Sequence, residues 1–191
     1  MKNLVGTKTE QNLLKGFAGE SQARTRYTLF AEKAKEEGYE QIAELFLETA
    51  ENEKYHAEKF FSFLEGRPLE ITATYPAGKV GTTAENLRAA AEGENEEHTE
   101  IYPEFAKVAK EEGFPQIAAV FNLVSKVEVE HEKRYLKLLE NLEQGKVFKK
   151  EGATRWKCRA CGYVHEAAGA PGKCPLCGVE KAYFEIKETN Y

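Results

Sequence analysis

The sequence predicts a mainly α-helical fold, namely a four-helix bundle with one long crossover, followed by a small C-terminal domain held together by a metal. Three observations predict it. Up to residue 145 the chain is rich in Glu, Lys, Ala and Leu, whereas glycine and proline concentrate after that point. One part of the helical region repeats at an offset of 75 residues. All four cysteines lie in the last 34 of the 191 residues, as two C-x-x-C pairs.

The internal repeat defines two helical hairpins. Residues 31–56 and 106–131 are identical at 12 of 26 aligned positions, including the turn sequence AKEEG. Gly38 and Gly113 end that sequence, where a left-handed conformation can terminate a helix. Two hairpins give four helices, and their predicted spans are 8–37, 39–65, 84–112 and 114–143.

Capping boxes predict where the first helix of each hairpin begins. They pair Thr7 with Glu10 and Thr82 with Glu85. The connection between the hairpins, RPLEITATYPAGKVGTT, is much longer than the glycine turns. Because one long crossover is the connectivity of ferritin-like bundles, we predict a ferritin-like four-helix bundle over residues 1–145.

The inward face of each predicted helix carries polar residues among its apolar ones. The second and fourth helices each present a Glu-x-x-His pair there, and the third presents two glutamates. The charged residues and histidines on these inward faces are Glu20, Arg24, Glu53, His56, Glu94, Glu97, Glu128 and His131.

Chance could explain any one of these glutamates, since 32 acidic residues will place some on any face. It fails for the set, because burying several unpaired carboxylates costs many kcal/mol each. Arg24 alone cannot balance five carboxylates, whereas two divalent cations can. A glutamate from each of two helices plus Glu-x-x-His from the other two is the pattern of di-iron and di-manganese carboxylate bundles. The residues off the inward face are expected at the surface: Glu51, Glu58, Glu92, Glu96, Glu100, His98 and His165.

The remainder is predicted to be a small metal-ribbon domain over residues 154–191, reached through a charged connector at 143–156. A domain this short cannot fold on a hydrophobic core alone, so the metal supplies much of its stability. Two C-x-x-C-G knuckles separated by twelve residues predict a tetrahedral tetrathiolate site. Spacing alone leaves iron and zinc open. The four ligands are Cys158, Cys161, Cys174 and Cys177.

Five motifs carry a family resemblance. They are GESQAR around Glu20, ENEKYH ending at His56, GENEEHTEIYPEFAKVAKEEG around Glu94 and Glu97, EVEHEKR around His131, and the cysteine-rich tail. Together they run from about residue 3 to the C terminus, and they resemble the rubrerythrins, in which a ferritin-like di-iron domain is fused to a rubredoxin-like domain.

That resemblance implies a role for each matching residue. Glu53 and Glu128 are implied to bridge two irons, with Glu20 a terminal ligand of the first iron. Glu94 and His131 are implied to bind the second. The C-x-x-C-G-Y and C-P-x-C-G sequences resemble rubredoxins, so the implied cofactors are two iron ions at the carboxylate site and one iron at the tetracysteine site, an iron–tetrathiolate centre.

The resemblance also implies that the first iron exchanges Glu97 for His56 as its oxidation state changes. Tyr27 and Tyr102 correspond to tyrosines near the metals in that family, although ordinary aromatic packing explains them equally well. They keep the offset of 75, whereas the glutamates Glu20 and Glu94 differ by 74. One residue is therefore inserted in the third helix, and we predict a π-bulge between Glu94 and Tyr102 that turns Glu97 toward the metals.

The function implied is that of a non-haem di-iron peroxidase that reduces hydrogen peroxide to water in protection against oxidative stress, with electrons relayed through the rubredoxin-type iron. Its catalytic residues would be the seven bundle ligands with Tyr27 and Tyr102. Implied partners are hydrogen peroxide, a redox donor that is rubredoxin-like or an NAD(P)H-dependent reductase, and a second copy of the chain in a homodimer or tetramer.

Two other functions stay open: a ferroxidase or iron-handling protein of the ferritin-like class, and a zinc-ribbon binding module. The net charge of −5 argues against nucleic acid as a partner, because phosphates require clustered cations. No window of about eighteen apolar residues is present, and the first residues lack the apolar core of a secretion signal. We therefore expect no membrane association and a cytoplasmic location.

Overall fold

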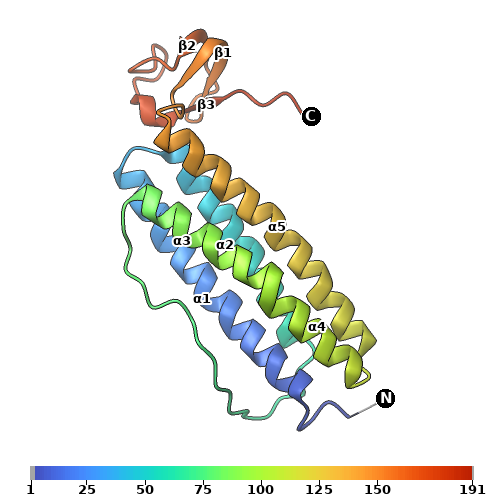
Figure 1. The fold of residues 1–191 in the computed structure, drawn as a ribbon. Helices are drawn as coiled ribbons and strands as arrows, with labels where there is room; N and C mark the ends of the chain where they lie inside the picture. The colour runs from blue at the N-terminus through green and yellow to red at the C-terminus, as the bar shows by residue number, and fades with distance from the viewer. Residues whose placement is uncertain (1–2, 191) are drawn as a thin grey trace.

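Two long helical hairpins lie side by side in the computed structural model, which describes residues 3–190, and a small β-sheet unit caps one end of them (Figure 1). The mainly helical, ferritin-like fold predicted from the sequence is confirmed. The first hairpin pairs α1 with α2, and the second pairs α3 and α4 with α5. Their bounds are Lys8–Glu36 for α1, Glu40–Phe61 for α2, Thr83–Glu96 for α3, Tyr102–Glu111 for α4 and Pro115–Glu143 for α5.

Glycine turns close both hairpins, as the repeat predicts. Gly38 and Gly113 have φ of 82° and 80°, a left-handed conformation that side chains with a Cβ rarely adopt. After each glycine the next amide donates back into the helix, Tyr39 N to the Ala34 carbonyl at 2.8 Å and Phe114 N to the Ala109 carbonyl at 2.7 Å.

The two predicted capping boxes differ. At α3 the box is complete, because the Thr82 side chain accepts from the Glu85 amide and the Glu85 carboxylate accepts from the Thr82 amide. At α1 the Thr7 side chain accepts from the Glu10 amide, but the Glu10 carboxylate binds the Gly6 amide and Arg67 instead. The guanidinium attracts the carboxylate more strongly than a neutral amide does, so only half of the predicted box forms there.

A five-residue π-helix, Glu97–Ile101, joins α3 to α4 and confirms the predicted π-bulge. The wider turn shifts the buried face by one position. Beyond it the buried residues are Tyr102, Ala106 and Ala109 rather than the Ile101, Phe105 and Val108 that unbroken helical periodicity selects.

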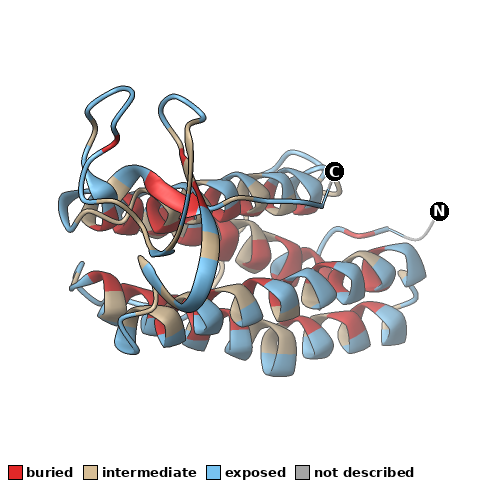
Figure 2. Ribbon diagram, turned by 90° about the horizontal axis from the view of Figure 1, so that it is seen from above, coloured by how far each residue is buried: buried red, intermediate tan, exposed pale blue. Residues whose placement is uncertain are grey.

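The bundle interior contains two hydrophobic clusters along its length. One surrounds Tyr27, Phe46 and Tyr135, and the other surrounds Phe60 and Phe121. Seen from above, the buried faces of the helices turn toward each other (Figure 2). The buried glutamates of the predicted metal site belong to neither cluster, so a polar layer interrupts the apolar core.

The small unit contains three antiparallel strands in the order β2-β1-β3, with β1 at Lys149–Cys158, β2 at Val164–Gly169 and β3 at Phe184–Ile186. A short 3-10 helix, η2, precedes β3 at Lys181–Tyr183. Trp156, Phe184 and two of the cysteines form its core, and the Trp156 indole donates to the Ala167 carbonyl at 3.0 Å.

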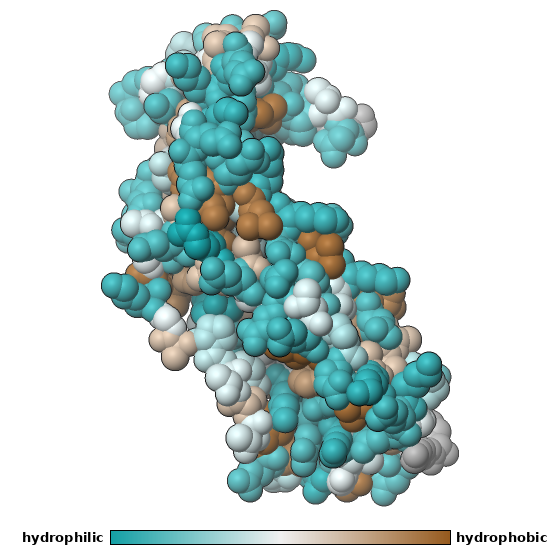
Figure 3. Space-filling model, in the orientation of Figure 1, coloured by the Kyte–Doolittle hydropathy of each residue, from teal (hydrophilic) through white to brown (hydrophobic). Residues whose placement is uncertain are grey.

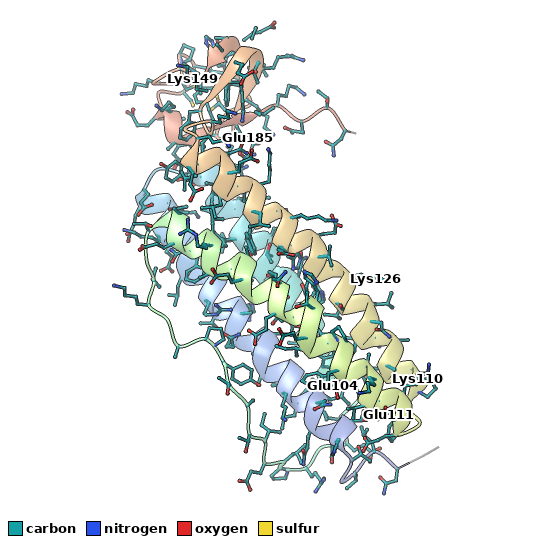
Figure 4. The ribbon with its side chains drawn as sticks, viewed as in Figure 1. Glu104, Lys110, Glu111, Lys126, Lys149 and Glu185 are labelled. Carbon is teal, nitrogen blue, oxygen red and sulfur yellow. The ribbon has the colours of Figure 1, made fainter. Side chains whose placement is uncertain are left out.

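The small unit packs against the α1–α2 turn of its own chain. Tyr39 stacks on Phe148 with ring centroids 6.0 Å apart, and Arg159 lies 3.7 Å from Glu44 of α2. Figure 4 labels Glu185 at this junction, where it pairs with Lys157 and Arg159. These contacts hold the sheet beyond the end of the bundle.

Hydrophilic residues predominate on the face shown in Figure 3, and the hydrophobic ones form separate small patches. Figure 4 labels Glu104, Lys110 and Lys126 on the outside of α4 and α5, where each is exposed. Across the part of the chain that the structure describes, none of the helices is both long enough and apolar enough to cross a bilayer.

Candidate metal centres

Two groups of ligand-type side chains meet in the polar layer of the bundle. In each group, one ligand atom per residue lies within 4.8 Å of all the others. The first group is Glu20, Glu53, His56 and Glu128, and the second is Glu53, Glu94, Glu128 and His131. Glu53 and Glu128 belong to both groups. The arrangement is that of two adjacent cation sites sharing two carboxylates.

Four helices contribute ligand-type side chains to this layer. Glu20 comes from α1 and Glu94 from α3, while α2 and α5 each supply a Glu-x-x-His pair. At 3.6 residues per turn, a spacing of three places both members of a pair on one face. The four glutamates are 0–1% exposed and His131 is 3% exposed, so water cannot compensate their charge.

Several atoms of this layer have no hydrogen bond although they are buried. These atoms are Glu20 Oε2, Glu53 Oε1, Glu94 Oε2, both carboxylate oxygens of Glu128, and His131 Nδ1. His131 Nδ1 lies only 2.7 Å from Glu128 Oε2, yet the two atoms are not aligned for a hydrogen bond. Unsatisfied buried polar atoms are rare in native proteins, and here they converge on two points. The residues present therefore fit a pair of cations.

The pKa values of the metal-free layer show the cost of its charge. Burial and the Glu53 carboxylate raise the pKa of Glu94 to about 8, and the same two causes raise the pKa of Glu20 well above its ordinary value. Burial opposes ionisation of Glu53 too, but its close contacts with the His131 and His56 imidazoles lower its pKa to about 2.

Both histidines respond to the carboxylates around them. Burial by itself would lower the pKa of His131, but its contacts with Glu128 and Glu53 raise it to about 12. Burial also opposes protonation of His56, but its contacts with Glu128 and Glu20 raise its pKa. Protons on the imidazoles take the place that metal cations would fill, because positive charge is needed in this layer in either case.

The two predicted tyrosines contact the carboxylates crosswise. Tyr27 of α1 donates to Glu94 Oε1 at 2.6 Å, and Tyr102 of α4 donates to Glu20 Oε1. Both rings are also buried in hydrophobic clusters. Each tyrosine therefore packs in the core and also bonds a buried carboxylate through its hydroxyl.

Glu97 is the one predicted bundle ligand outside the two groups. It lies in the π-helix, is half-buried, and lines a pocket together with Tyr102. Burial and the Glu20 carboxylate raise the pKa of Glu97 well above its ordinary value. His56 occupies the position near Glu20 that the family resemblance assigns alternately to His56 and Glu97.

Three expectations about other residues are wrong, namely those for Arg24, His98 and His165. Arg24 is exposed and Ala23 takes the buried position, because the real helical face runs through Gly16, Gly19 and Ala23. His98 is half-buried rather than at the surface, and its Nε2 lies 2.6 Å from Glu132 Oε2 of α5. The π-turn rotates His98 toward α5, which a regular helix would not do.

The other residues predicted off the inward face are exposed, with the exception of one histidine. The expected solvated positions are confirmed for Glu51, Glu58, Glu92, Glu96 and Glu100, all of which are exposed. His165, expected at the surface, is half-buried on β2 because it is paired with Trp156 in the sheet.

Sequence reasoning missed Asn52, whose Oδ1 lies 3.3 Å from His131 Nε2. A bond there fixes the imidazole so that Nδ1 faces the carboxylates, as a metal-binding histidine requires. Asn52 lies off the inward face of α2, and its position next to Glu53 is the only sequence signal that could have indicated a role near the metal site.

The four cysteines converge at one end of the sheet as free thiols. Their sulfurs are 3.8 Å apart for Cys158 and Cys177 and 3.7 Å apart for Cys161 and Cys174. Four sulfurs bound to one ion at about 2.3 Å lie about 3.8 Å apart in a tetrahedron. Disulfides would need about 2.05 Å. The spacing fits one tetrahedrally bound metal.

Backbone amides tune these thiols. Burial opposes ionisation of Cys174, but the amides of Cys177 and Leu176 lower its pKa to about 6. For Cys161 the Tyr163 amide favours the thiolate, yet burial and the neighbouring thiols raise its pKa to about 12. One sulfur is thus ready to bind metal at neutral pH, and a bound cation would ionise the others.

A carboxylate–histidine pair of metal sites inside a ferritin-like bundle, joined to a tetracysteine metal site, defines a two-domain non-haem iron protein. A family model described as Rubrerythrin matches residues 11–151, and one described as Rubrerythrin, rubredoxin-like domain, matches residues 156–185. The chain therefore belongs to the rubrerythrin family, a family of oxidoreductases. Its cofactors are two iron ions at the carboxylate site and one iron at the tetracysteine site.

Individual relatives agree with this assignment. The chain is 62% identical over 190 residues to a rubrerythrin of Porphyromonas gingivalis, covering 100% of this chain and 95% of that relative. It is similar to a solved structure of fully reduced, all-ferrous nigerythrin, with TM-score 0.64 and 32% identity over 97% of this chain and 89% of that one. A Desulfovibrio desulfuricans bacterioferritin structure gives TM-score 0.63 at 26% identity, covering 73% of this chain and 82% of that one.

Proposed function

We propose that this protein is a non-haem peroxidase that reduces hydrogen peroxide to water at the bundle site, with electrons delivered through the iron of the tetracysteine site, and that it protects the cytoplasm against oxidative stress. The observation that carries the proposal is the sharing of Glu53 and Glu128 by two adjacent cation sites on a chain that also has a one-electron metal site. When bound, a ferrous pair supplies two electrons and two adjacent Lewis-acid positions, which cleavage of an O–O bond needs.

We propose the following roles for the side chains of the bundle site. Glu53 and Glu128 hold the two cation positions at a bridging separation, with Glu20, Glu94 and His131 as terminal ligands. Tyr102 and Tyr27 orient the terminal carboxylates through their hydroxyl hydrogen bonds.

Glu97 differs from the other predicted ligands in its position and in its surroundings. It is half-buried at a pocket and outside the two ligand groups, and burial with the nearby Glu20 carboxylate raises its pKa, which favours its protonated form. Reduction of one peroxide to two waters consumes two electrons and two protons. We propose that Glu97 delivers one of these protons to the peroxide. Anionic Glu97 and neutral His56 would be the two alternative groups that hold the first cation, and the anion would suit its oxidised state.

The length of the bundle favours electron delivery from a second copy of the chain. Along α2, Glu40 at the junction with the small unit and Glu53 in the metal layer are separated by about 20 Å at 1.5 Å per residue. The β-sheet unit, which carries the four cysteines, lies beyond that end (Figure 1). We propose a homodimer or tetramer in which the 154–191 domain of one chain serves the 1–145 domain of another, with a rubredoxin-like protein or an NAD(P)H-dependent reductase upstream.

Rapid mixing of the reduced protein with hydrogen peroxide tests the activity. We expect reoxidation of both iron centres with one peroxide consumed per two electrons, faster than with dioxygen. Slower reaction with peroxide than with dioxygen would refute the peroxidase. Iron uptake far beyond three per chain would instead favour the ferroxidase and iron-handling function that the bacterioferritin likeness suggests.

Mixing two defective variants tests electron delivery between chains. Cys174→Ser removes a sulfur of the tetracysteine site, and Glu128→Ala removes a shared carboxylate of the bundle site. Neither variant alone should turn over, whereas unfolded and reassembled mixtures should regain activity. Activity that does not return on mixing, although each variant binds iron at its intact site, would contradict electron transfer between subunits.

A further inference from the structure

A pocket of about 280 Å³ leads from the surface of the bundle toward the metal layer. It lies between α1, the crossover segment 72–76, and the α3–π–α4 segment. Tyr102, which is 1% exposed, and half-buried Glu97 line its inner part. Tyr102 in turn donates to Glu20. The pocket therefore connects solvent with two residues of the proposed reaction site.

The floor of this pocket depends on small residues of α1. Gly16 and Gly19 are both buried and both line it. A Cβ at position 19 would lie 3.5 Å from Cε1 of Tyr75, which is an ordinary contact, so a methyl group fits there. A longer side chain would extend into the volume of the pocket. The absence of a side chain at residue 19 keeps this volume open.

The crossover covers the pocket from outside. Figure 1 shows this segment running along α1, and the Tyr75 hydroxyl donates to the Lys15 carbonyl at 2.8 Å. Tyr75 also lines the pocket, with Lys15, Gln22 and Arg26 providing polar groups near the surface. The tyrosine ring thus lines the pocket from the crossover side and is anchored at its hydroxyl to α1.

The volume limits what can pass. A water molecule has about 30 Å³ of liquid volume, so the pocket accommodates hydrogen peroxide with a few waters, while drug-sized ligands occupy pockets of about 300–1,000 Å³. Lys15 and Arg26 offer hydrogen-bond donors near the surface, and Gln22 offers both a donor and an acceptor, so a small molecule that donates and accepts hydrogen bonds finds partners there. At the inner end, the carboxyl group of Glu97 offers a further hydrogen-bond partner.

We propose that this pocket is the access route for hydrogen peroxide, with Tyr75 as the residue that sets the upper size of hydroperoxide admitted and Gly19 as the residue that keeps the route open. The proposal rests on the proposed peroxidase function. It adds a specificity-determining residue on the crossover, a segment that supplies none of the predicted ligands.

Two substitutions at one position test the route. Gly19→Leu fills the pocket, whereas Gly19→Ala adds a single methyl group that fits and improves helix propensity by about 1 kcal/mol. Comparison of leucine with alanine isolates the effect of filling the pocket. Ala119→Leu, at an exposed position of α5, is the matched control for added bulk.

The first readout is binding rather than turnover. The association rate of azide, a three-atom anion, with the oxidised iron-loaded protein is followed by its visible spectrum. We expect Gly19→Leu to slow azide association and peroxide reoxidation by about tenfold or more, which corresponds to about 1.4 kcal/mol of barrier. Gly19→Ala and Ala119→Leu should match the unmodified protein. Unchanged azide association in Gly19→Leu overturns the route, even if peroxide is reduced normally.

Substitutions of Tyr75 provide a second test that does not depend on tolerance at Gly19. Tyr75→Ala should raise the rate with cumene hydroperoxide relative to hydrogen peroxide by about tenfold, again about 1.4 kcal/mol. Tyr75→Phe keeps the ring and should preserve the original preference. An unaltered preference in Tyr75→Ala overturns the size-limiting role. Absence of peroxide reduction in the unmodified protein, with slowed azide binding in Gly19→Leu, would instead refute the proposed function while leaving the route intact.

Discussion

The hydroxyl of Tyr27 donates a 2.6 Å hydrogen bond to Oε1 of Glu94, from the first hairpin to the second. Tyr102 of the second hairpin donates to Glu20 of the first. Each half of the internal repeat therefore positions a carboxylate of the other half. The same exchange occurs at the helix ends, where Glu37 accepts from the Thr83 amide and Glu112 accepts from the Lys8 amide.

Removal of the Tyr27 hydroxyl tests this crosswise support. In Tyr27→Phe the buried Glu94 carboxylate loses its donor, and an unsatisfied buried acceptor costs about 1–3 kcal/mol. We expect that loss in the free energy of unfolding of the metal-free protein, measured by urea denaturation. Tyr55→Phe, at a residue that is 61% exposed, should change stability very little. Equal stability of the two variants would show that the hydrogen bond is unimportant.

Stability of the metal-free bundle should fall as pH rises. Glu94 has its pKa raised from 4.5 to about 8, and His131 from 6.5 to about 12. A raised folded-state pKa stabilises the fold below the unfolded value and loses that effect as pH rises through the folded value. Thermal unfolding should therefore show a decline that begins near pH 5, continues through pH 8 as Glu94 ionises, and extends to higher pH as His131 loses its proton. The iron-loaded protein should lack this decline, since cations then replace the protons.

Metal binding at neutral pH should release protons from the same groups. Both histidines have raised pKa values and are protonated at pH 7 in the metal-free layer, whereas imidazole binds metal in its neutral form. Anaerobic addition of ferrous ion to the Cys174→Ser variant, in weak buffer with a pH indicator, should release about two protons or more per chain. Metal uptake without proton release would show that the histidines are not ligands.

Glu132 should hold the π-helix in place. Its carboxylate accepts from Asn95 Nδ2 at 2.9 Å and lies 2.6 Å from His98 Nε2. In Glu132→Ala both contacts are lost, so amide hydrogen exchange across Glu97–Ile101 should speed up. Glu130→Ala removes a nearby carboxylate that pairs with exposed Lys133, and serves as the control. Identical exchange in both variants would mean that other contacts fix the π-helix.

Sequence alone predicted the helices and the π-bulge because both follow from the repeat. A hairpin duplicated at an offset of 75 has to turn at Gly38 and Gly113 in both copies, and the offset of 74 between Glu20 and Glu94 requires one inserted residue. The tetracysteine site was equally predictable, because two knuckles specify their ligands by spacing alone.

Other features depend on contacts between segments that are distant in sequence. Periodicity placed Arg24 in the core because it cannot distinguish two adjacent positions at the edge of a helical face, and Ala23 is the one buried. The capping box at Thr7 is incomplete because Arg67, 57 residues from Glu10, competes for the same carboxylate. His98 turned inward only because the π-turn rotated it toward Glu132. The ligand roles assigned to the seven bundle residues stay a prediction.

The central claim is that two iron ions neutralise the buried carboxylates between the hairpins, and anomalous diffraction at the iron absorption edge tests it most directly. Crystals of the purified protein should show two neighbouring iron peaks in the bundle, each within bonding distance of both Glu53 and Glu128, and a third peak surrounded by the four cysteine sulfurs. Iron-replete crystals with no metal between Glu53 and Glu128, and with those side chains bonded only to protonated histidines, would contradict the account.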